Sequence, residues 1–299
     1  MKIGVIGMGF VGGTTAKVFK RTHKIFPYDK YKKEYCSEKN IKELAKNSEA
    51  VLICVPTPMK QSGAIDYSAI YDSLNILIEN VKKIRRNPKE IVVIIRSTAV
   101  PGTTDKMAKK YPFKFAFNPE FLREKNAIED MKNTDRVVIG SNEKYTANKV
   151  IAIYKPLFPN AKYIIVDRKT AEMIKYAANV FLASQVTLAN EIYNVCKSVG
   201  IDYGKVKDTI LLDERIARNI NVPGPDGDFG FGGKCFPKDL NALIYLAKEK
   251  KYNPRLLKEI WKSNKRFRNK KDWLDIPGAT SANNNFKIKQ SKIKDKRKK

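Results

Sequence analysis

The chain has 299 residues, of which 42% are hydrophobic and 10% aromatic, and this composition excludes a disordered polymer. A domain holds about 150 residues, so the length indicates two domains with a sizeable core. No apolar run approaches the ~20 residues that a membrane span needs, and the segment after Met1 is too short for the core of a signal peptide. We therefore expect an intracellular, cytoplasmic protein.

The formal net charge is +28, from 59 Lys and Arg against 31 Asp and Glu. Residues 287–299 hold eight basic residues and one acidic residue, so this tail supplies +7 and the remaining +21 is spread through the chain. Spread charge is weak evidence for a nucleic-acid groove, because most lysines lie on solvated helix faces. A nucleic-acid partner is therefore expected only through the basic tail.

The first part of the chain alternates β-type runs with helical patterns, as a parallel sheet with crossover helices does. This alternation predicts a doubly wound, Rossmann-like α/β domain over residues 1–166. The predicted strands are 3–6, 24–28, 50–55, 91–95, 114–117, 136–139 and 162–166, and the clearest helices between them are 12–20, 67–82 and 143–154.

A long helical pattern follows, from 169 to about 199, in which apolar residues recur near the helical period without Pro or Gly. Such a helix spans roughly 45 Å and suits a connector between domains. Further helices are predicted over 203–212, 239–250 and 254–267. We expect a small all-α central domain over 167–268 and a basic, disordered tail over 269–299.

Glycines at G-x-G-x-x-G spacing directly follow the first predicted strand and open a helix. They permit a tight turn and let backbone N–H groups approach a pyrophosphate at the helix N-terminus. An acid at the end of the second strand can bind the ribose hydroxyls and would repel a 2′-phosphate, so NAD is favoured over NADP. The alternative is a glycine turn with an ordinary surface acid. The cofactor-binding candidates are Gly7, Gly9, Phe10, Val11, Gly12 and Asp29.

Hydride transfer from an alcohol to a nicotinamide cofactor also requires a general base to accept the hydroxyl proton, and this base is often a histidine. The only histidine, His23, precedes the second predicted strand, on the wrong side of the cofactor domain for chemistry. We expect a structural role for His23 and another group for the proton.

Two later motifs are highly specific: GFGGKCFPKD at 230–239 and NPEFLRE at 118–124. With the glycine turn, VPTP at 55–58, RSTAVPGTT at 96–104 and DRVVIG at 135–140, they stand in the same order as in the UDP-glucose/GDP-mannose dehydrogenase family. Over about residues 1–265 the chain resembles this family, and within it most closely the UDP-glucose 6-dehydrogenases. The resemblance implies a homodimer that oxidises UDP-glucose with two NAD to UDP-glucuronate, a polysaccharide precursor. A GDP-mannose or UDP-N-acetylmannosamine dehydrogenase is the alternative within the family.

Oxidation of a primary alcohol to a carboxylate takes two steps, and a thiol can hold the intermediate aldehyde as a thiohemiacetal and then as a thioester. Cys235 lies between Gly232 and Lys238, among two glycines and two lysines that favour a thiolate. The four cysteines show no paired metal-ligand spacing, and no metal is expected. A buried structural role is expected for Cys36, Cys54 and Cys196.

Lys175 and Asn179 stand four residues apart on the connector helix and share a face, so both can donate to a developing oxyanion. Alone, such a pair is more often a solvated helix face; the resemblance implies that it stabilises the alkoxide and thiohemiacetal oxygens. The resemblance also implies that Asp239 acts with Thr98 through a water, as general base or water-orienting group. Thr98 and Glu124 are further expected beside the cofactor.

Glu120 and Glu124 are four residues apart, and paired carboxylates can divide acid and base roles. The resemblance implies that Glu124 activates the water that hydrolyses the thioester and that Glu120 supports the water network. The alternative is a surface pair with Arg123 and Lys125.

Substrate contacts come from the resemblance as well. It implies that an arginine in LLDERIA reaches across a dimer interface to the sugar; otherwise this arginine is an ordinary residue of a helix surface. The substrate-binding candidates are Glu120, Phe121, Leu122, Lys175, Asn179, Arg215, Gly232 and Lys238.

Members of the family continue through a second Rossmann-like domain that binds the uridine diphosphate. Here GATSANNNF and the lysine-rich tail follow the connector instead. Remote binding energy normally drives the chemical step, so an alternative function is a weakly active or non-catalytic NAD-binding module whose basic tail binds an anion.

Overall fold

The computed structural model describes residues 1–123, 126–276 and 279–281. The chain forms two compact units. The first, which we call the sheet unit, comprises Met1–Thr57 and Tyr67–Lys175; the second, the helical unit, comprises Pro58–Asp66 and the chain from Tyr176 onward. The division falls inside helix α7 (Arg168–Ser198), whereas the sequence predicted it at 166/167.

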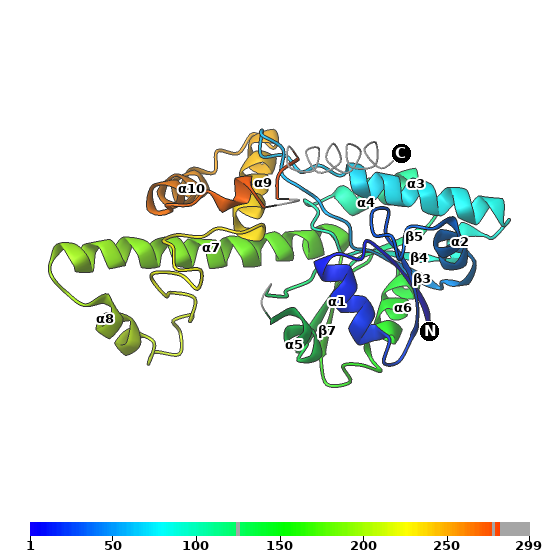
Figure 1. Cartoon of the computed structure of the whole chain (residues 1–299), viewed down its shortest axis with the longest axis horizontal. Helices are drawn as coiled ribbons and strands as arrows, with labels where there is room; N and C mark the ends of the chain where they lie inside the picture. The colour runs from blue at the N-terminus through cyan, green and yellow to red at the C-terminus, as the bar shows by residue number, and fades with distance from the viewer. Residues whose placement is uncertain (124–125, 277–278, 282–299) are drawn as a thin grey trace, which may run out of the picture. The chain divides into compact units, whose positions relative to one another are not determined.

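The sheet unit is built on a seven-stranded sheet of order β2-β1-β3-β4-β5-β6-β7 (Figure 1). Neighbouring strands are parallel except β5 and β6, which meet antiparallel only at Phe117 and Gly140. The sheet is therefore mixed rather than purely parallel, as is common for large α/β sheets. The strands are β1 (Lys2–Ile6), β2 (Lys24–Tyr28), β3 (Ala50–Ile53), β4 (Val92–Ile95), β5 (Lys114–Phe117), β6 (Arg136–Gly140) and β7 (Lys162–Val166).

Helices cover both faces of this sheet, which confirms the doubly wound fold (Figure 1). On one face α2 (Glu38–Asn47), α3 (Ser68–Lys83) and α4 (Thr103–Lys110) contribute the buried Leu44, Leu77 and Met107. On the other face α1 (Phe10–Phe19), α5 (Ala127–Lys132) and α6 (Lys144–Tyr154) contribute Phe19, Met131 and Val150. The sequence patterns had not singled out α2, α4 or α5, the last two of which are short.

The strand order positions a ligand site. β1 lies between β2 and β3, so the chain winds in opposite directions from β1. Ligands of open α/β sheets bind outside the carboxyl ends of the strands at such a switch point. Gly7 follows β1 at this edge, where its N–H donates to the Tyr28 carbonyl at 2.9 Å.

The helical unit contains the C-terminal part of α7, then α8 (Tyr203–Ile210), α9 (Cys235–Glu249) and α10 (Arg255–Phe267). Its main apolar cluster is small and is centred on Val180, Leu240 and Ile260. The 3-10 helix η3 (Asp272–Leu274) follows α10. No helix in the described part of the chain is long and apolar enough to cross a membrane.

The expectation of disorder from residue 269 onward is wrong for residues 269–276. Trp273 is only 4% exposed, and its ring centre lies 5.1 Å from that of Trp261 on α10. Burial of one aromatic side chain outweighs the polar composition of its neighbours, which is why composition alone misjudged this segment. Residues 282–299, with most of the basic tail, lie outside the described residues.

Candidate active site

The glycine turn between β1 and α1 leaves its backbone open. Gly7 has a φ of +92°, and a Cβ on Gly12 would lie 1.8 Å from the Gly7 carbonyl oxygen. A Cβ on Gly9 would meet no heavy atom within 4 Å. The first turn of α1 has no side-chain cap and no acidic residue, so its N–H groups suit an anion such as a pyrophosphate.

Asp29 is fixed beside this turn. Its Oδ2 accepts from the Met8 N–H at 2.7 Å, and its Oδ1 accepts from the Tyr31 N–H at 2.9 Å. The carboxylate thus stands at the carboxyl end of β2, next to the glycines, where a ribose would lie. The open backbone at Gly9 and the anchored acid together fit NAD.

Buried polar groups gather at the carboxyl ends of β4 and β5. Arg96, only 4% exposed, donates to Asn118 Oδ1 and to the Tyr154 hydroxyl. Asn118 Nδ2 donates to the Val138 carbonyl at 2.7 Å. Burial raises the pKa of the neighbouring Cys54 thiol to about 12, against the opposing charge of Arg96. Cys54 is buried, as the sequence predicted, and this raised pKa keeps its thiol protonated.

Lys175 and Glu120 form a buried ion pair. Their Nζ and Oε1 atoms are 3.2 Å apart, and the side chains are 7% and 10% exposed. Glu120 Oε2 also accepts from the Leu122 N–H at 2.8 Å, and the Phe121 ring centre lies 5.5 Å from Nζ. The structure thus brings the predicted Glu120 and Phe121 to the ammonium group of Lys175, and the predicted Leu122 to Glu120.

The alternative of a surface pair between the two glutamates and their basic neighbours is wrong for Glu120, which is buried against Lys175. Arg123 instead contacts Asp130, with Nη2 and Oδ1 at 2.6 Å. Glu124 lies outside the described residues.

Thr98 is half-buried in the loop between β4 and α4, and Glu172 of α7 anchors the end of this loop. The two carboxylate oxygens of Glu172 accept from the Gly102 N–H at 2.5 Å and from the Thr104 N–H at 2.7 Å. Burial raises the pKa of Glu172 to about 7. Glu172 was not among the residues predicted from the sequence, although an acid on a largely apolar helix, three residues before Lys175, was the available signal.

In the helical unit, Cys235 is the first residue of α9 and is exposed. Asp239, one turn later and 1% exposed, accepts from Asn179 Nδ2 at 2.5 Å through Oδ2 and from Lys238 Nζ at 2.5 Å through Oδ1. A helix does begin at Cys235, so Cys235 and Asp239 stand on one face as expected. Because Lys238 is buried and paired with Asp239, a preference for thiolate at Cys235 rests on the helix N-terminus more than on this lysine.

The remaining predicted residues have mixed outcomes. Cys196 is buried as expected, but Cys36 is exposed because it lies in the turn before α2. Arg215 follows α8 in a turn rather than on a helix, and its exposed guanidinium contacts Asp213 Oδ2 at 2.5 Å. His23 is buried and its Nε2 lies 2.7 Å from the Ile153 carbonyl oxygen, as befits a structural histidine.

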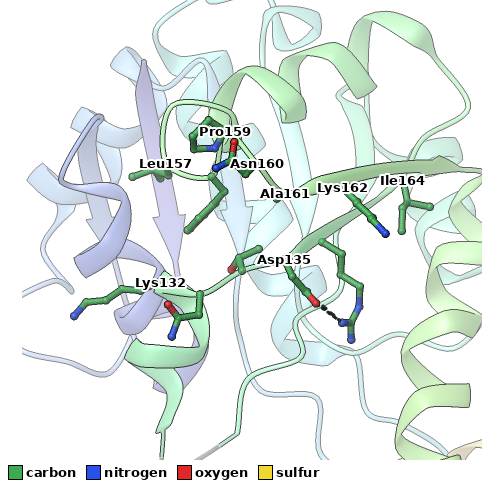
Figure 2. A pocket seen from close by; sticks show the side chains of 12 residues that line it. Lys132, Asp135, Leu157, Pro159, Asn160, Ala161, Lys162 and Ile164 are labelled. Carbon is green, nitrogen blue, oxygen red and sulfur yellow. Dashed lines mark hydrogen bonds and ion pairs between the residues drawn. The ribbon is translucent and has the colours of Figure 1, made fainter. Parts of the chain in front are cut away.

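A surface pocket of about 790 Å³ lies at the beginnings of β6 and β7 (Figure 2). Lys132, Arg136 and Lys162 give it basic walls, and Arg136 pairs with Asp135 at 3.2 Å. None of the predicted site residues lines it, but the guanidinium carbon of Arg136 in its wall lies 4.9 Å from the ring centre of Phe121.

Comparison with known proteins gives a family match for both units. The model of the NAD-binding domain of the UDP-glucose/GDP-mannose dehydrogenase family matches residues 27–158, and that of its central domain matches residues 169–266. The UDP-glucose 6-dehydrogenase of Rickettsia bellii is 35% identical over 300 residues, which cover 89% of this chain and 67% of that protein.

Solved structures agree. A UDP-glucose dehydrogenase from the archaeon Pyrobaculum islandicum superimposes with a TM-score of 0.77 at 27% identity, covering 89% of this chain and 68% of that one. A GDP-mannose dehydrogenase from Pseudomonas aeruginosa gives a TM-score of 0.64 at 30% identity, with coverage of 89% and 69%. The chain thus spans about two thirds of the length of each.

Proposed function

Because the chain belongs to the UDP-glucose/GDP-mannose dehydrogenase family, we propose that it is an NAD-dependent UDP-glucose 6-dehydrogenase that forms UDP-glucuronate. The observation that carries the proposal is the first turn of α9. There an exposed cysteine precedes, by one turn, a buried aspartate that binds Asn179 and Lys238. The family motifs around both residues are specific, and the buried Lys175–Glu120 pair supplies the cation that the chemistry requires.

The reaction balances as UDP-glucose with two NAD and one water giving UDP-glucuronate, two NADH and three protons. NAD held by the glycine turn and Asp29 would supply the hydride acceptor for both oxidations. The C6 hydroxyl loses its proton as the aldehyde forms, and the Cys235 thiolate then adds to the aldehyde carbon to give a thiohemiacetal. Its oxidation gives a thioester, and water releases the carboxylate and returns the thiol.

Lys175 and Asn179 stabilise the oxygen that becomes negative in these steps. An ammonium group carries three N–H donors and an amide two, and a preorganised donor in a dry site lowers the barrier where charge develops. Glu120 supports this role because it holds the ammonium by an ion pair that is largely shielded from water. The backbone of Leu122 in turn orients Glu120.

The proton and water steps fall to carboxylates. Asp239, with Thr98, orients a water or takes the proton, and Glu124 activates the water that hydrolyses the thioester. The two donors on Asp239 fix its carboxylate in one orientation, as a positioned base requires.

We further propose that the protein acts as a homodimer through α7. This helix exposes a row of apolar side chains at helical spacing, which is typical of a helix that packs on a partner. The exposed position of Arg215 is compatible with a contact to the sugar bound by a second copy. The row consists of Phe181, Leu188, Ile192 and Val195 of α7 and of Val199, directly after its end.

The test is NADH formation by the purified protein with UDP-glucose, GDP-mannose and UDP-N-acetylmannosamine. We expect two NADH per UDP-glucose and none from Cys235→Ser, while Cys36→Ser, the other exposed cysteine, retains activity. If no nucleotide sugar reduces NAD, or if Cys235→Ser is as active as the wild type, the proposal is wrong. Two NADH from GDP-mannose alone would transfer the assignment to the sister activity.

A second candidate is a non-catalytic NAD-binding protein whose tail binds an anionic partner, favoured by the +7 charge of residues 287–299. It predicts NAD binding without turnover. It also predicts nucleic-acid binding that weakens steeply with salt and disappears when residues 287–299 are deleted.

A further inference from the structure

The loop that leads to Cys235 is held by the end of α10. Asn264 has no exposed surface, and its amide brackets Phe231: Oδ1 accepts from the Phe231 N–H at 2.7 Å, and Nδ2 donates to the Phe231 carbonyl at 2.9 Å. Gly230, with a φ of +64°, passes so close that a Cβ there would lie 2.4 Å from Asn264 Oδ1. The loop is therefore fitted to α10 by polar contacts as well as by packing.

Directly after α10, at its C-cap position, Arg268 is the centre of a buried charge cluster. Its side chain is 2% exposed, and its Nε donates to the Lys270 carbonyl at 3.0 Å. The removal of one partner from a buried charge network leaves the others uncompensated, so such a network has a strongly preferred geometry. The carboxylates around the guanidinium are those of Asp226 at 2.6 Å, Asp272 at 3.1 Å and Asp228 at 3.6 Å.

Asp272 connects this cluster to the turn before the cysteine. Its Oδ2 forms an ion pair with Arg268 Nη2 at 3.1 Å and accepts a hydrogen bond from the Gly233 N–H at 3.0 Å. The preceding glycine lies against the same pair, since a Cβ on Gly232 would be 2.1 Å from Arg268 Nη2 and 2.4 Å from Asp272 Oδ1. Gly232 is thus pressed against Arg268 and Asp272, and Gly233 is bound to Asp272 through its N–H.

The first turn of α9 depends on this contact. Lys234, the residue at its N-cap position, makes no side-chain capping bond. The entry of the chain into α9, and with it the place of Cys235, is therefore fixed by the turn that precedes it. Arg268 and Asp272 come after the residues that the central-domain family model matches, which end at 266.

We propose that Arg268 and Asp272 are positioning residues that hold the Gly232–Gly233 turn and so place the Cys235 thiol for reaction. For the rate of the reaction, this inference rests on the proposed function. For the position of the thiol it does not, because the reactivity of a cysteine can be measured without turnover. When Arg268 and Asp272 no longer hold the Gly232–Gly233 turn, the first turn of α9 frays. The helix N-terminus that favours the thiolate is then lost.

The experiment compares Asp272→Ala with Asp272→Asn, which keeps an oxygen to accept from the Gly233 N–H. The matched control is Asp275→Ala, an exposed aspartate three residues later. Alkylation by iodoacetamide is followed by mass spectrometry, and the rate at Cys235 is divided by the rate at the exposed Cys36 of the same molecule. Amide hydrogen exchange is measured over residues 228–236.

We expect Asp272→Ala to lower the alkylation ratio about tenfold, since the loss of roughly 1.4 kcal/mol of thiolate stabilisation corresponds to that factor. Exchange over 228–236 becomes faster, kcat with UDP-glucose falls by a similar factor, and KM changes less than about twofold. Asp272→Asn retains most of the wild-type ratio, and Asp275→Ala retains all of it. Because Cys235 is already exposed, greater access contributes little.

An unchanged alkylation ratio in folded Asp272→Ala would overturn the proposal, and so would equal losses in Asp272→Ala and Asp275→Ala. If Asp272→Ala does not fold, Asp272→Asn and Arg268→Lys carry the same comparison, with a smaller loss expected for Asp272→Asn. A wild-type protein that forms no NADH refutes the proposed function. The alkylation and exchange results still test whether Arg268 and Asp272 position Cys235.

Discussion

The two units hold their functional residues by different means. In the sheet unit, the glycine turn, Asp29, Arg96 and Asn118 follow the ends of neighbouring strands of one sheet, of which β1, β4 and β5 are largely buried on both faces. In the helical unit the apolar clusters are small, and the loop before Cys235 is held by Asn264, Arg268 and their partners. Backbone topology thus places the cofactor site, whereas a network of side chains places the cysteine.

The sharpest test of the sheet unit is a pair of adjacent glycines. Gly12→Ala puts a methyl group 1.8 Å from the Gly7 carbonyl oxygen, so the turn must move, and we expect loss of NAD binding. Gly13 also lies in α1, but the methyl group of Gly13→Ala would have no neighbouring atom closer than 3.5 Å. This variant should stabilise the protein by about 0.5–1 kcal/mol. Calorimetric NAD titration and thermal unfolding measure both. Equal behaviour of the two variants would contradict a site fixed by backbone contact.

The next largest effect is expected at Lys175. Lys175→Met keeps the length of the side chain but removes the cation, and we expect kcat to fall about 10²–10³-fold, as for the loss of an oxyanion donor. Lys169→Met, at an exposed position of the same helix, should leave kcat unchanged. Steady-state NADH formation with UDP-glucose measures both variants. A rise in KM with an unchanged kcat would rule out transition-state stabilisation by Lys175.

In the helical unit a single amide should matter for stability. Asn264→Ala leaves the N–H and carbonyl of Phe231 buried without their partner, which costs about 2–4 kcal/mol. Asn221→Ala removes an exposed amide and should cost less than about 0.5 kcal/mol. Urea unfolding followed by tryptophan fluorescence reports on this unit through Trp261 and Trp273. Similar urea midpoints for the two variants would contradict a stabilising role of the hydrogen bonds between Asn264 and Phe231.

The smallest predicted effect depends on pH. Burial raises the pKa of Glu172 to about 7 from 4.5, so between these values the folded state binds more protons than the unfolded state. Its contribution to stability is present at low pH and is lost as the pH rises through 7. From pH 5 to pH 8 the free energy of unfolding should fall by about 2 kcal/mol more in the wild type than in Glu172→Gln. If the urea midpoints of the wild type and of Glu172→Gln change with pH in the same way, this prediction is wrong.

This contrast also explains what the sequence could predict. Strands with continuous apolar runs, the glycine spacing and Asp29 are local patterns, and the sheet unit formed around them as expected. The antiparallel contact between Phe117 and Gly140 was missed, because strand direction depends on how the chain returns and not on the composition of the strand.

The helical unit was predicted less well, for a physical reason. The contacts of Arg268 with Asp226 and Asp228 join residues 42 and 40 positions apart, at no spacing that marks a motif, and only Asp272 stands at the i,i+4 spacing of a local charge pair. The burial of Lys238 was missed for the same reason, because its ion pair with Asp239 forms only when α9 is folded. Residues 269–276 looked polar and were predicted to be disordered, although Trp273 anchors them.

The central claim is that the sugar becomes covalently attached to Cys235 during oxidation. The most direct measurement is rapid acid quenching of the protein during turnover of UDP-glucose and NAD, followed by mass spectrometry of the peptide that contains Cys235. We predict a thioester of UDP-glucuronate on Cys235, enriched in Glu124→Ala because hydrolysis is slowed. Continued formation of two NADH per sugar with Cys235 unmodified at every time point would contradict the account.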